Sequence, residues 1–308
     1  MKKIKIGVVG LGNLGRACIE IIKERKNEFQ LIAVFSRREV SGCISLAQIN
    51  EYKDKIDVLL VCVGSQADAP ILVPQLAQNF NTVDSFDNHA EIPLYIERIN
   101  ENQDNTTAIV ATGWDPGLFS IVRIYFDAFI GGTAESFYGK GVSLGHTNAV
   151  RAIQGVQDAI QFTIPKSEAV TKVRKGQQVD CLEKHKRLCY VVCEHDSPEE
   201  RKRIENEIKS MKNYFENQEV EIIFISKKDF DKRYKNKVSH GGMVLSGDGK
   251  STIELKLKLK SNPRFTAQVM IAYAIANYNL QQQDRSGVFT VADIEPALLT
   301  NCNYLQKI

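Results

Sequence analysis

GVVGLGNLGR, residues 7–16, overlaps the apolar segment IKIGVVG and opens a helical pattern that runs from about Asn13 to Asn27. Within it, Gly10, Gly12 and Gly15 have the G-x-G-x-x-G spacing. In such a loop the first glycine permits a tight turn, the second lets the backbone approach a pyrophosphate, and the third permits close helix packing. The order strand, glycine loop, helix therefore predicts a dinucleotide site, with the phosphates at the helix N-terminus beside Asn13 and Leu14.

The rest of the first third alternates apolar runs of strand length with helical patterns. The runs are LIAVF, VLLVCVG at 58–64, TVDSF at 82–86 and TAIVAT at 107–112, and the helices are expected at 69–80 and near 92–102. Strands that are almost continuously Val, Ile and Leu are covered on both faces. The sequence therefore predicts an α/β fold, with a Rossmann-type doubly wound parallel sheet.

The pattern changes after Gly113. Glycine-rich segments and the extended stretches LCYVVCEH, EVEIIFIS and TIELKLKLK follow, and they predict a second, α+β domain. A well-buried helix over 265–280 then returns to the first domain. We expect a nucleotide-binding domain at 1–114, completed by 263–308, and a second domain at 115–262.

Two segments of the second domain carry local signals. In SPEERKRIENEIKSM, Ser197 is the expected N-cap, Pro198 the first helical residue and Glu200 the partner in a capping box. TIELKLKLK alternates apolar and charged residues, which is typical of a sheet with one wet face. Its apolar face needs a cover, either its own helices or a second subunit.

Arginines stand where many NAD-binding proteins carry an acidic residue, at the end of the second predicted strand. A carboxylate there accepts hydrogen bonds from the ribose hydroxyls and repels a 2'-phosphate. Ser36, Arg37 and Arg38 reverse that choice. Charge-assisted bonds to phosphate are each worth about 1.5–3 kcal/mol, which predicts NADP rather than NAD. Gly64 and Ser65, after the strand at 58–64, complete the predicted cofactor contacts.

Composition excludes several classes of protein. The 308 residues carry 40 basic and 37 acidic side chains, a net charge of +3, so nothing favours a nucleic-acid or membrane partner. The chain has no apolar run of membrane length and no cleavable leader, and its seven cysteines are irregularly spaced, so we expect a cytoplasmic protein with reduced thiols.

Two patterns resemble ligand sites without meeting their geometry. His185, Cys189, Cys193 and His195 fall in a predicted strand, where residues four apart are separated by about 13 Å, too far for two sulfurs to share one zinc. GDGKS at 247–251 lacks the first glycine of a phosphate loop, and a hairpin turn at Asp248-Gly249 explains it. We therefore expect no metal.

Longer motifs indicate a family. GLGNLGR, FSRR, DSFDNH, TGWDPGLFS, GHTNAVR, GVQDAIQFTIP, HKRLCYVV, RIENEIKSM and HGG occur in this order over nearly the whole chain. The sequence resembles the NADP-dependent meso-diaminopimelate D-dehydrogenases of lysine and peptidoglycan precursor supply. The resemblance implies oxidative deamination of the D-centre of meso-2,6-diaminopimelate to L-2-amino-6-oxopimelate, ammonia and NADPH. It also implies a homodimer whose second domain supplies substrate contacts and the subunit interface.

By the same resemblance, the substrate contacts fall on Ser85, Asp87, Trp114, Asp115, Tyr138, Thr163, Arg187, His240 and Asn262. Tyr138 stands where a family member has tryptophan, so it keeps an aromatic wall and adds a hydroxyl. The chemistry agrees, because the substrate has two carboxylates and two ammonium groups. Carboxylates after strand ends orient ammonium groups, and Arg187 can bind a carboxylate bidentately.

Removal of a hydride also requires a neutral amine, so a base must take a proton. Asp87 and Asp115 are the candidates, although either can serve only as an amine anchor. Two other functions fit parts of the sequence. One is another NADP-dependent reductase of the lysine pathway, and the other is an NADP-sensing regulator without turnover. Substrate-dependent NADPH production distinguishes the regulator from the enzymes.

Overall fold

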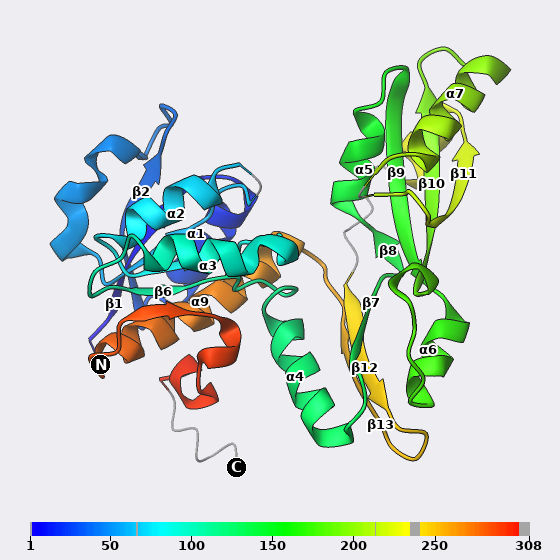
Figure 1. Cartoon of the computed structure of the whole chain (residues 1–308). Coiled ribbons are helices and arrows are strands. Elements are labelled where there is room, and N and C mark those ends of the chain that lie inside the picture. The colour runs from blue at the N-terminus through cyan, green and yellow to red at the C-terminus, as the bar shows by residue number, and fades with distance from the viewer. Residues whose placement is uncertain (1, 66, 213, 235–240, 302–308) are drawn as a thin grey trace. The chain divides into compact units, whose positions relative to one another are not determined.

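The structure is a computed structural model that describes residues 2–65, 67–212, 214–234 and 241–301. The chain forms two compact units, which are Met1–Ile121 together with Pro263–Ile308, and Val122–Asn262. The helix α4 (Leu118–Ile130) spans the boundary between them. Each unit has its own sheets and its own apolar core, and each is described separately below (Figure 1).

The first unit is built on one parallel sheet of seven strands in the order β14-β6-β5-β4-β1-β2-β3. Its elements are β1 (Ile4–Val9), α1 (Asn13–Glu24), β2 (Phe29–Ser36), β3 (Ile44–Ser45), β4 (Val58–Val61), α2 (Ala69–Ala77), β5 (Thr82–Asp84), α3 (Ile92–Asn100), β6 (Thr107–Ile109), α9 (Asn262–Gln281) and β14 (Gly287–Phe289). The order reverses between β1 and β4, as in a Rossmann sheet. The predicted fold class is confirmed.

Alternating residues of the strands pack into two apolar cores, one on each face of this sheet. Val58 and Leu60 of β4 pack with α1 and α9, whereas Leu59 and Val61 pack with α2 and α3. Asn277 of α9 is fully buried and donates from its side-chain amide to the carbonyls of Thr82 and Thr107, at 3.1 and 2.9 Å. These bonds fix α9 against the first residues of β5 and β6, so a helix from beyond the second unit completes the first.

Several strands are shorter than their apolar runs. The run at 107–112 forms a strand only to Ile109, because Ala111 adopts a left-handed backbone conformation with φ of 57°. The run at 82–86 ends as a strand at Asp84. Both strands end before their apolar runs do, at the carboxyl edge of the sheet, where ligands bind in open α/β folds.

The second unit contains two small sheets (Figure 1). One has the order β11-β10-β9-β8 and the other is an antiparallel sheet in the order β13-β12-β7. The elements are β7 (Glu135–Tyr138), β8 (Gly141–Val142), α5 (Leu144–Arg151), β9 (Val156–Pro165), α6 (Ser167–Arg174), β10 (His185–Cys193), α7 (Pro198–Lys209), β11 (Glu219–Phe224), α8 (Lys227–Arg233), β12 (Gly242–Gly247) and β13 (Thr252–Leu257). Helices α5 and α7 share a core with β9 and β10.

Local predictions in this unit have mixed outcomes. The hairpin turn at Asp248-Gly249 is confirmed, because β12 and β13 pair through Gly247 and Thr252. Ser197 caps α7 by accepting a hydrogen bond from the Glu200 amide at 3.2 Å. The capping box is wrong, since the Glu200 carboxylate bonds Arg203 instead of returning to the Ser197 amide.

In the described part of the chain, no helix combines the length and the hydrophobicity needed to cross a membrane.

Candidate functional site

The glycine loop has the geometry that a dinucleotide requires. Gly10 has φ of 95°, and a Cβ there would lie 2.5 Å from the Cys62 carbonyl oxygen. A Cβ on Gly15 would lie 1.9 Å from the Gly10 carbonyl oxygen, so α1 packs against the loop only with glycine at this position. A Cβ on Gly12 would have nothing within 4 Å of it, which leaves the backbone open to a close ligand. The backbone conformation at Gly10 and the space around Gly12 and Gly15 therefore agree with the spacing, and contact of these glycines with a cofactor stays a prediction.

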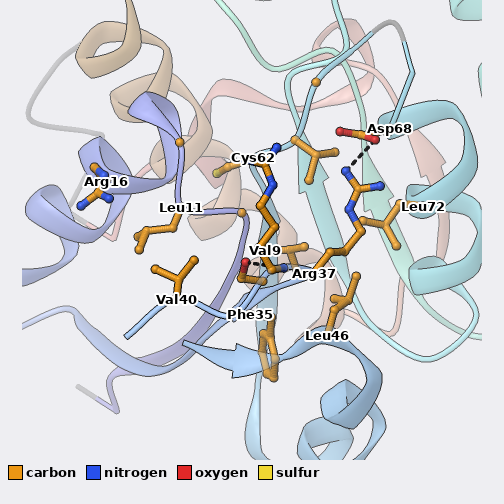
Figure 2. A pocket seen from close by; sticks show the side chains of 16 residues that line it. Val9, Leu11, Arg16, Phe35, Arg37, Val40, Leu46, Cys62, Asp68 and Leu72 are labelled. Carbon is orange, nitrogen blue, oxygen red and sulfur yellow. Dashed lines mark hydrogen bonds and ion pairs between the residues drawn. The ribbon is translucent and has the colours of Figure 1, made fainter. Parts of the chain in front are cut away.

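A pocket of about 440 Å³ lies at the carboxyl ends of β1, β2 and β4, where the strand order reverses (Figure 2). Six predicted cofactor residues line it, namely Gly10, Gly12, Ser36, Arg37, Arg38 and Gly64. Asn13, Leu14 and Gly15 form the first turn of α1, and Ser65 follows Gly64. Val40, Leu46 and Leu72 add apolar walls. Backbone amides, apolar walls and two arginines suit the phosphates and the adenosine of NADP.

Asp68 is a pocket residue that the sequence analysis missed. Its carboxylate pairs with the Arg37 guanidinium at 2.7 Å (Figure 2), and the two side chains are 30% and 59% exposed. Asp68 stands at the start of α2, where its amide donates to the Gly64 carbonyl at 3.1 Å. On the neighbouring loop the Ser36 hydroxyl accepts from the Arg38 amide at 3.1 Å. The structure thus places one acidic side chain, Asp68, and three basic ones, Arg16, Arg37 and Arg38, in this pocket.

Four predicted substrate residues follow the next two strands of the same sheet. Ser85 and Asp87 follow β5, and Trp114 and Asp115 follow β6. Asp87 is exposed, and Trp114 is 9% exposed with its ring edge-on to Phe119. The loop that carries Trp114 and Asp115 is tight, and a Cβ on Gly117 would lie 1.8 Å from the Gly113 carbonyl oxygen.

Three others lie on the sheets of the second unit. Thr163 of β9 and Arg187 of β10 are directly paired in register, and Arg187 Nη1 donates to Thr163 Oγ1 at 2.8 Å. Burial lowers the pKa of Arg187 from its ordinary value, yet the guanidinium stays charged. Its Nε is buried without a hydrogen-bond partner among the described residues, which include no carboxylate within ion-pair distance of it. Such a cation suits a carboxylate ligand.

Tyr138 ends β7 beside a histidine that the sequence analysis treated only as part of an apparent metal motif. His185 is 4% exposed, and its Nε2 accepts a hydrogen bond from the Tyr138 amide at 2.8 Å. The two rings stack with centroids 5.6 Å apart. His185 therefore fixes the backbone of Tyr138. Within the described residues, no cluster of three or more His, Cys, Asp or Glu side chains could hold a metal ion.

Two predicted substrate residues remain, Asn262 and His240. Asn262 begins α9, and His240 lies outside the described residues. The predicted substrate residues thus form two described groups, one after β5 and β6 and one on β7, β9 and β10.

Comparison with known proteins identifies relatives along the whole chain. Residues 113–261 match the family described as the diaminopimelic acid dehydrogenase C-terminal domain. A meso-diaminopimelate D-dehydrogenase of Ureibacillus thermosphaericus is 42% identical, with 97% of this chain and 96% of that protein aligned. The enzyme of the same name from Corynebacterium glutamicum is 40% identical over the same shares of the two chains.

Solved structures agree with these relatives. The C. glutamicum DAP dehydrogenase in complex with DAP superposes with a TM-score of 0.88 at 38% identity, covering 99% of this chain and 98% of that one. An engineered D-amino acid dehydrogenase bound to NADP+ gives a TM-score of 0.81 at 37% identity, with the same coverage.

Proposed function

Because the chain belongs to the meso-diaminopimelate D-dehydrogenase family, we infer that it is an NADP-dependent amino-acid dehydrogenase acting on the D-centre of meso-2,6-diaminopimelate. The reaction gives L-2-amino-6-oxopimelate, ammonia and NADPH, is reversible, and belongs to diaminopimelate and lysine biosynthesis. Relatives named as dehydrogenases over nearly the full chain favour this function over a regulator without turnover or another reductase of the pathway.

We assign the first unit to NADP and assign substrate binding and dimerisation to 115–262. Gly10, Gly12, Asn13, Leu14 and Gly15 would hold the pyrophosphate, with Gly64 and Ser65 beside it. Ser36, Arg37 and Arg38 would bind the 2'-phosphate. The positions of these residues around the pocket after β1, β2 and β4 support this assignment.

Arg187 is the observation that carries the substrate proposal. The half-buried Arg187 side chain, bonded to Thr163 and with its Nε hydrogen unused, offers a carboxylate two parallel donors. Tyr138 would form an aromatic wall, and His240 and Asn262 would donate to carboxylates. Ser85, Asp87, Trp114 and Asp115 would surround an ammonium end, where an aspartate orients the amine.

When bound, NADP supplies the acceptor for the hydride of the D-centre. The protein must present that C–H bond and remove a proton from the ammonium group, because only a neutral amine contributes its lone pair to the imine. Asp87 or Asp115 would take this proton, directly or through water. Asparagine at the base should depress turnover more than binding, whereas asparagine at an amine anchor should also raise KM.

The test of the function is NADPH formation by the purified protein, followed by absorbance. We expect turnover with meso-diaminopimelate and NADP, and much less with LL-diaminopimelate, D-alanine or NAD. Absence of turnover with every substrate, despite NADPH binding, would overturn the proposal in favour of a regulator.

A neighbouring pair of residues tests the substrate site itself. Arg187→Met should raise KM for meso-diaminopimelate at least tenfold and leave the NADPH Kd unchanged. Lys186→Met is the matched control, because Lys186 precedes Arg187 on β10, points to the other face of the sheet and pairs with Glu221 at 2.5 Å. Equal effects of the two changes would refute a specific role for Arg187.

We further propose a cytoplasmic homodimer formed through the second unit. Helix α4 exposes Ile124, Tyr125 and Phe129, and Phe129 is 71% exposed with its ring stacked on Tyr125 at 5.8 Å. The apolar residues of β13 also remain only half-buried. A second copy of the chain would cover these side chains. Light scattering should find a dimer that Phe129→Glu weakens, whereas Ile71→Glu, at an equally exposed position on α2, should leave it intact. Dimers of equal stability would argue against this interface.

A further inference from the structure

One buried carboxylate has no part in the chemistry described above. Asp84 ends β5 and is 1% exposed. It lies in the middle of a predicted strand, directly before Ser85 and three residues before Asp87. Its contacts reach both of the chain segments in the first unit to which substrate residues are assigned.

The side chain of Asp84 organises the segment after β5. Oδ1 accepts a hydrogen bond from the Phe86 amide at 2.8 Å, two residues ahead. This is the bond of an Asx turn, and it restricts the backbone of the residue that it encloses. That residue is Ser85, and the chain leaves the turn at Asp87. The Asp84 carboxylate therefore sets the direction in which both side chains are presented.

The main chain of Asp84 organises the segment after β6. Its carbonyl accepts from the Thr112 amide at 2.9 Å and from the Thr112 hydroxyl at 2.7 Å. Thr112 follows Ala111, whose φ of 57° lies in the left-handed region, where a residue with a Cβ is strained. Two bonds to one carbonyl hold the chain immediately after this strained residue. Trp114 and Asp115 follow after one intervening residue, Gly113.

We propose that Asp84 is a positioning residue that fixes the Ser85–Asp87 turn and the Trp114–Asp115 loop relative to each other at the substrate site. The inference rests on the proposed function, which assigns these four residues to the substrate. Asp84 itself needs no contact with the substrate. Its effect is on the orientation of a reacting amine, for which small displacements of the holding groups are costly.

The charge of Asp84 supports this role. Burial raises its pKa to about 6, although the Phe86 amide, the Tyr95 hydroxyl and the Ala111 amide act to lower it. Asp84 Oδ2 and the Tyr95 hydroxyl are both buried without a direct hydrogen-bond partner among the described residues. The Tyr95 hydroxyl therefore lowers the pKa of Asp84 from beyond hydrogen-bond distance. The other titratable group that senses Asp84 is Cys62, whose pKa is raised well above its usual value by its bond to Cys18, by burial and by nearby charges. Both neighbours are neutral at pH 7, whereas Asp84 is ionised and bonds the Phe86 amide more strongly.

Asp84→Asn tests the proposal, with Tyr95→Phe as the matched control in the same core. We expect Asp84→Asn to lower kcat/KM for meso-diaminopimelate at least tenfold, with the NADPH Kd changed less than twofold. Tyr95→Phe should change neither value by more than twofold. The deficit of Asp84→Asn should shrink from pH 8 to pH 5.5, because the wild-type carboxyl is mostly protonated at the lower pH. The deficit is the ratio of kcat/KM in wild type to kcat/KM in the variant. Titration of the substrate amine affects both enzymes equally and does not change this ratio.

Three results would overturn the proposal. One is a deficit that is equal at all pH values, another is a parallel loss of NADPH affinity, and the third is wild-type kinetics in Asp84→Asn. If that variant does not fold, Thr112→Val removes the hydroxyl that binds the Asp84 carbonyl and should raise KM several-fold at constant NADPH Kd. An unchanged KM would then count against Asp84. Inactivity of the wild type with all substrates would instead overturn the proposed function.

Discussion

Replacing Arg37 with alanine should change the choice between NADP and NAD without changing the binding of the common part of the two cofactors. Arg37 lines the nucleotide pocket at the end of β2 and pairs with Asp68 at 2.7 Å. Of the two cofactors, only NADP has a 2'-phosphate, which would give this guanidinium an anionic group of the cofactor to bind. The affinity for NADP should therefore fall while the affinity for NAD stays constant.

The size of the effect follows from exposure. A charge-assisted hydrogen bond contributes about 1.5–3 kcal/mol. Because the Arg37 side chain is 59% exposed, the lower limit applies, and about 1.5 kcal/mol corresponds to roughly a tenfold loss. The variant also leaves Asp68 without its cation beside the phosphate, so the loss should be larger at low salt, where charges are screened less.

The assay is kcat/KM for NADP and for NAD at saturating meso-diaminopimelate, expressed as a ratio. Arg16→Ala is the matched control, because Arg16 lines the same pocket but lies on α1, away from Arg37 (Figure 2). Arg16→Ala should leave the ratio unchanged, even if it weakens both cofactors equally. An unchanged ratio in Arg37→Ala, or an equal loss with NAD, would refute the assignment of Arg37 to the 2'-phosphate.

Three further changes test the local structure. Gly15→Ala places a Cβ 1.9 Å from the Gly10 carbonyl oxygen, so NADPH affinity, measured by fluorescence titration, should fall tenfold or more. Ser197→Ala removes the N-cap bond of α7 and should cost about 1 kcal/mol, seen as a Tm lower by roughly 2–4 °C with unchanged kcat. Asp84 has a folded-state pKa of about 6 against an ordinary 3.8, so its contribution to stability is fully present below pH 4 and is lost as pH rises through 6. Urea unfolding of the first unit, followed by Trp114 fluorescence, should show wild type losing roughly 2.4 kcal/mol relative to Asp84→Asn from pH 4 to 7, and a constant difference would contradict this.

The arrangement of the nucleotide site could be predicted from sequence because its causes are local. The spacing of Gly10, Gly12 and Gly15 fixes a loop, and the neighbouring apolar runs fix a parallel sheet. Handedness and short connections then restrict the strand order. Arg37 and Arg38 follow a strand whose carboxyl end must lie beside that loop, so their place in the pocket was predictable as well.

Other contacts had no local signal. Arg37 and Asp68 are separated by 31 positions and meet only because the end of β2 lies near the start of α2. The left-handed conformation of Ala111 was hidden, since TAIVAT has the composition of an ordinary strand. His185 bonds the amide of Tyr138, 47 positions away. Because almost any residue can supply a backbone amide, the sequence does not indicate this contact.

The two proposed binding functions differ in how much of the fold they depend on. Arg37 and Arg38, two of the three residues assigned to the 2'-phosphate, are exposed charges in the pocket, so they can change with little cost in stability. The groups that support the substrate site are buried, with Asp84 and Thr163 each 1% exposed and His185 4% exposed, and each bonds main chain or a second side chain. A buried, ionised carboxylate and a left-handed alanine both reduce stability, and both lie where the chain leaves the sheet for a proposed substrate segment. Substitutions should therefore alter cofactor preference independently of folding, whereas changes beneath the substrate residues should affect stability and catalysis together.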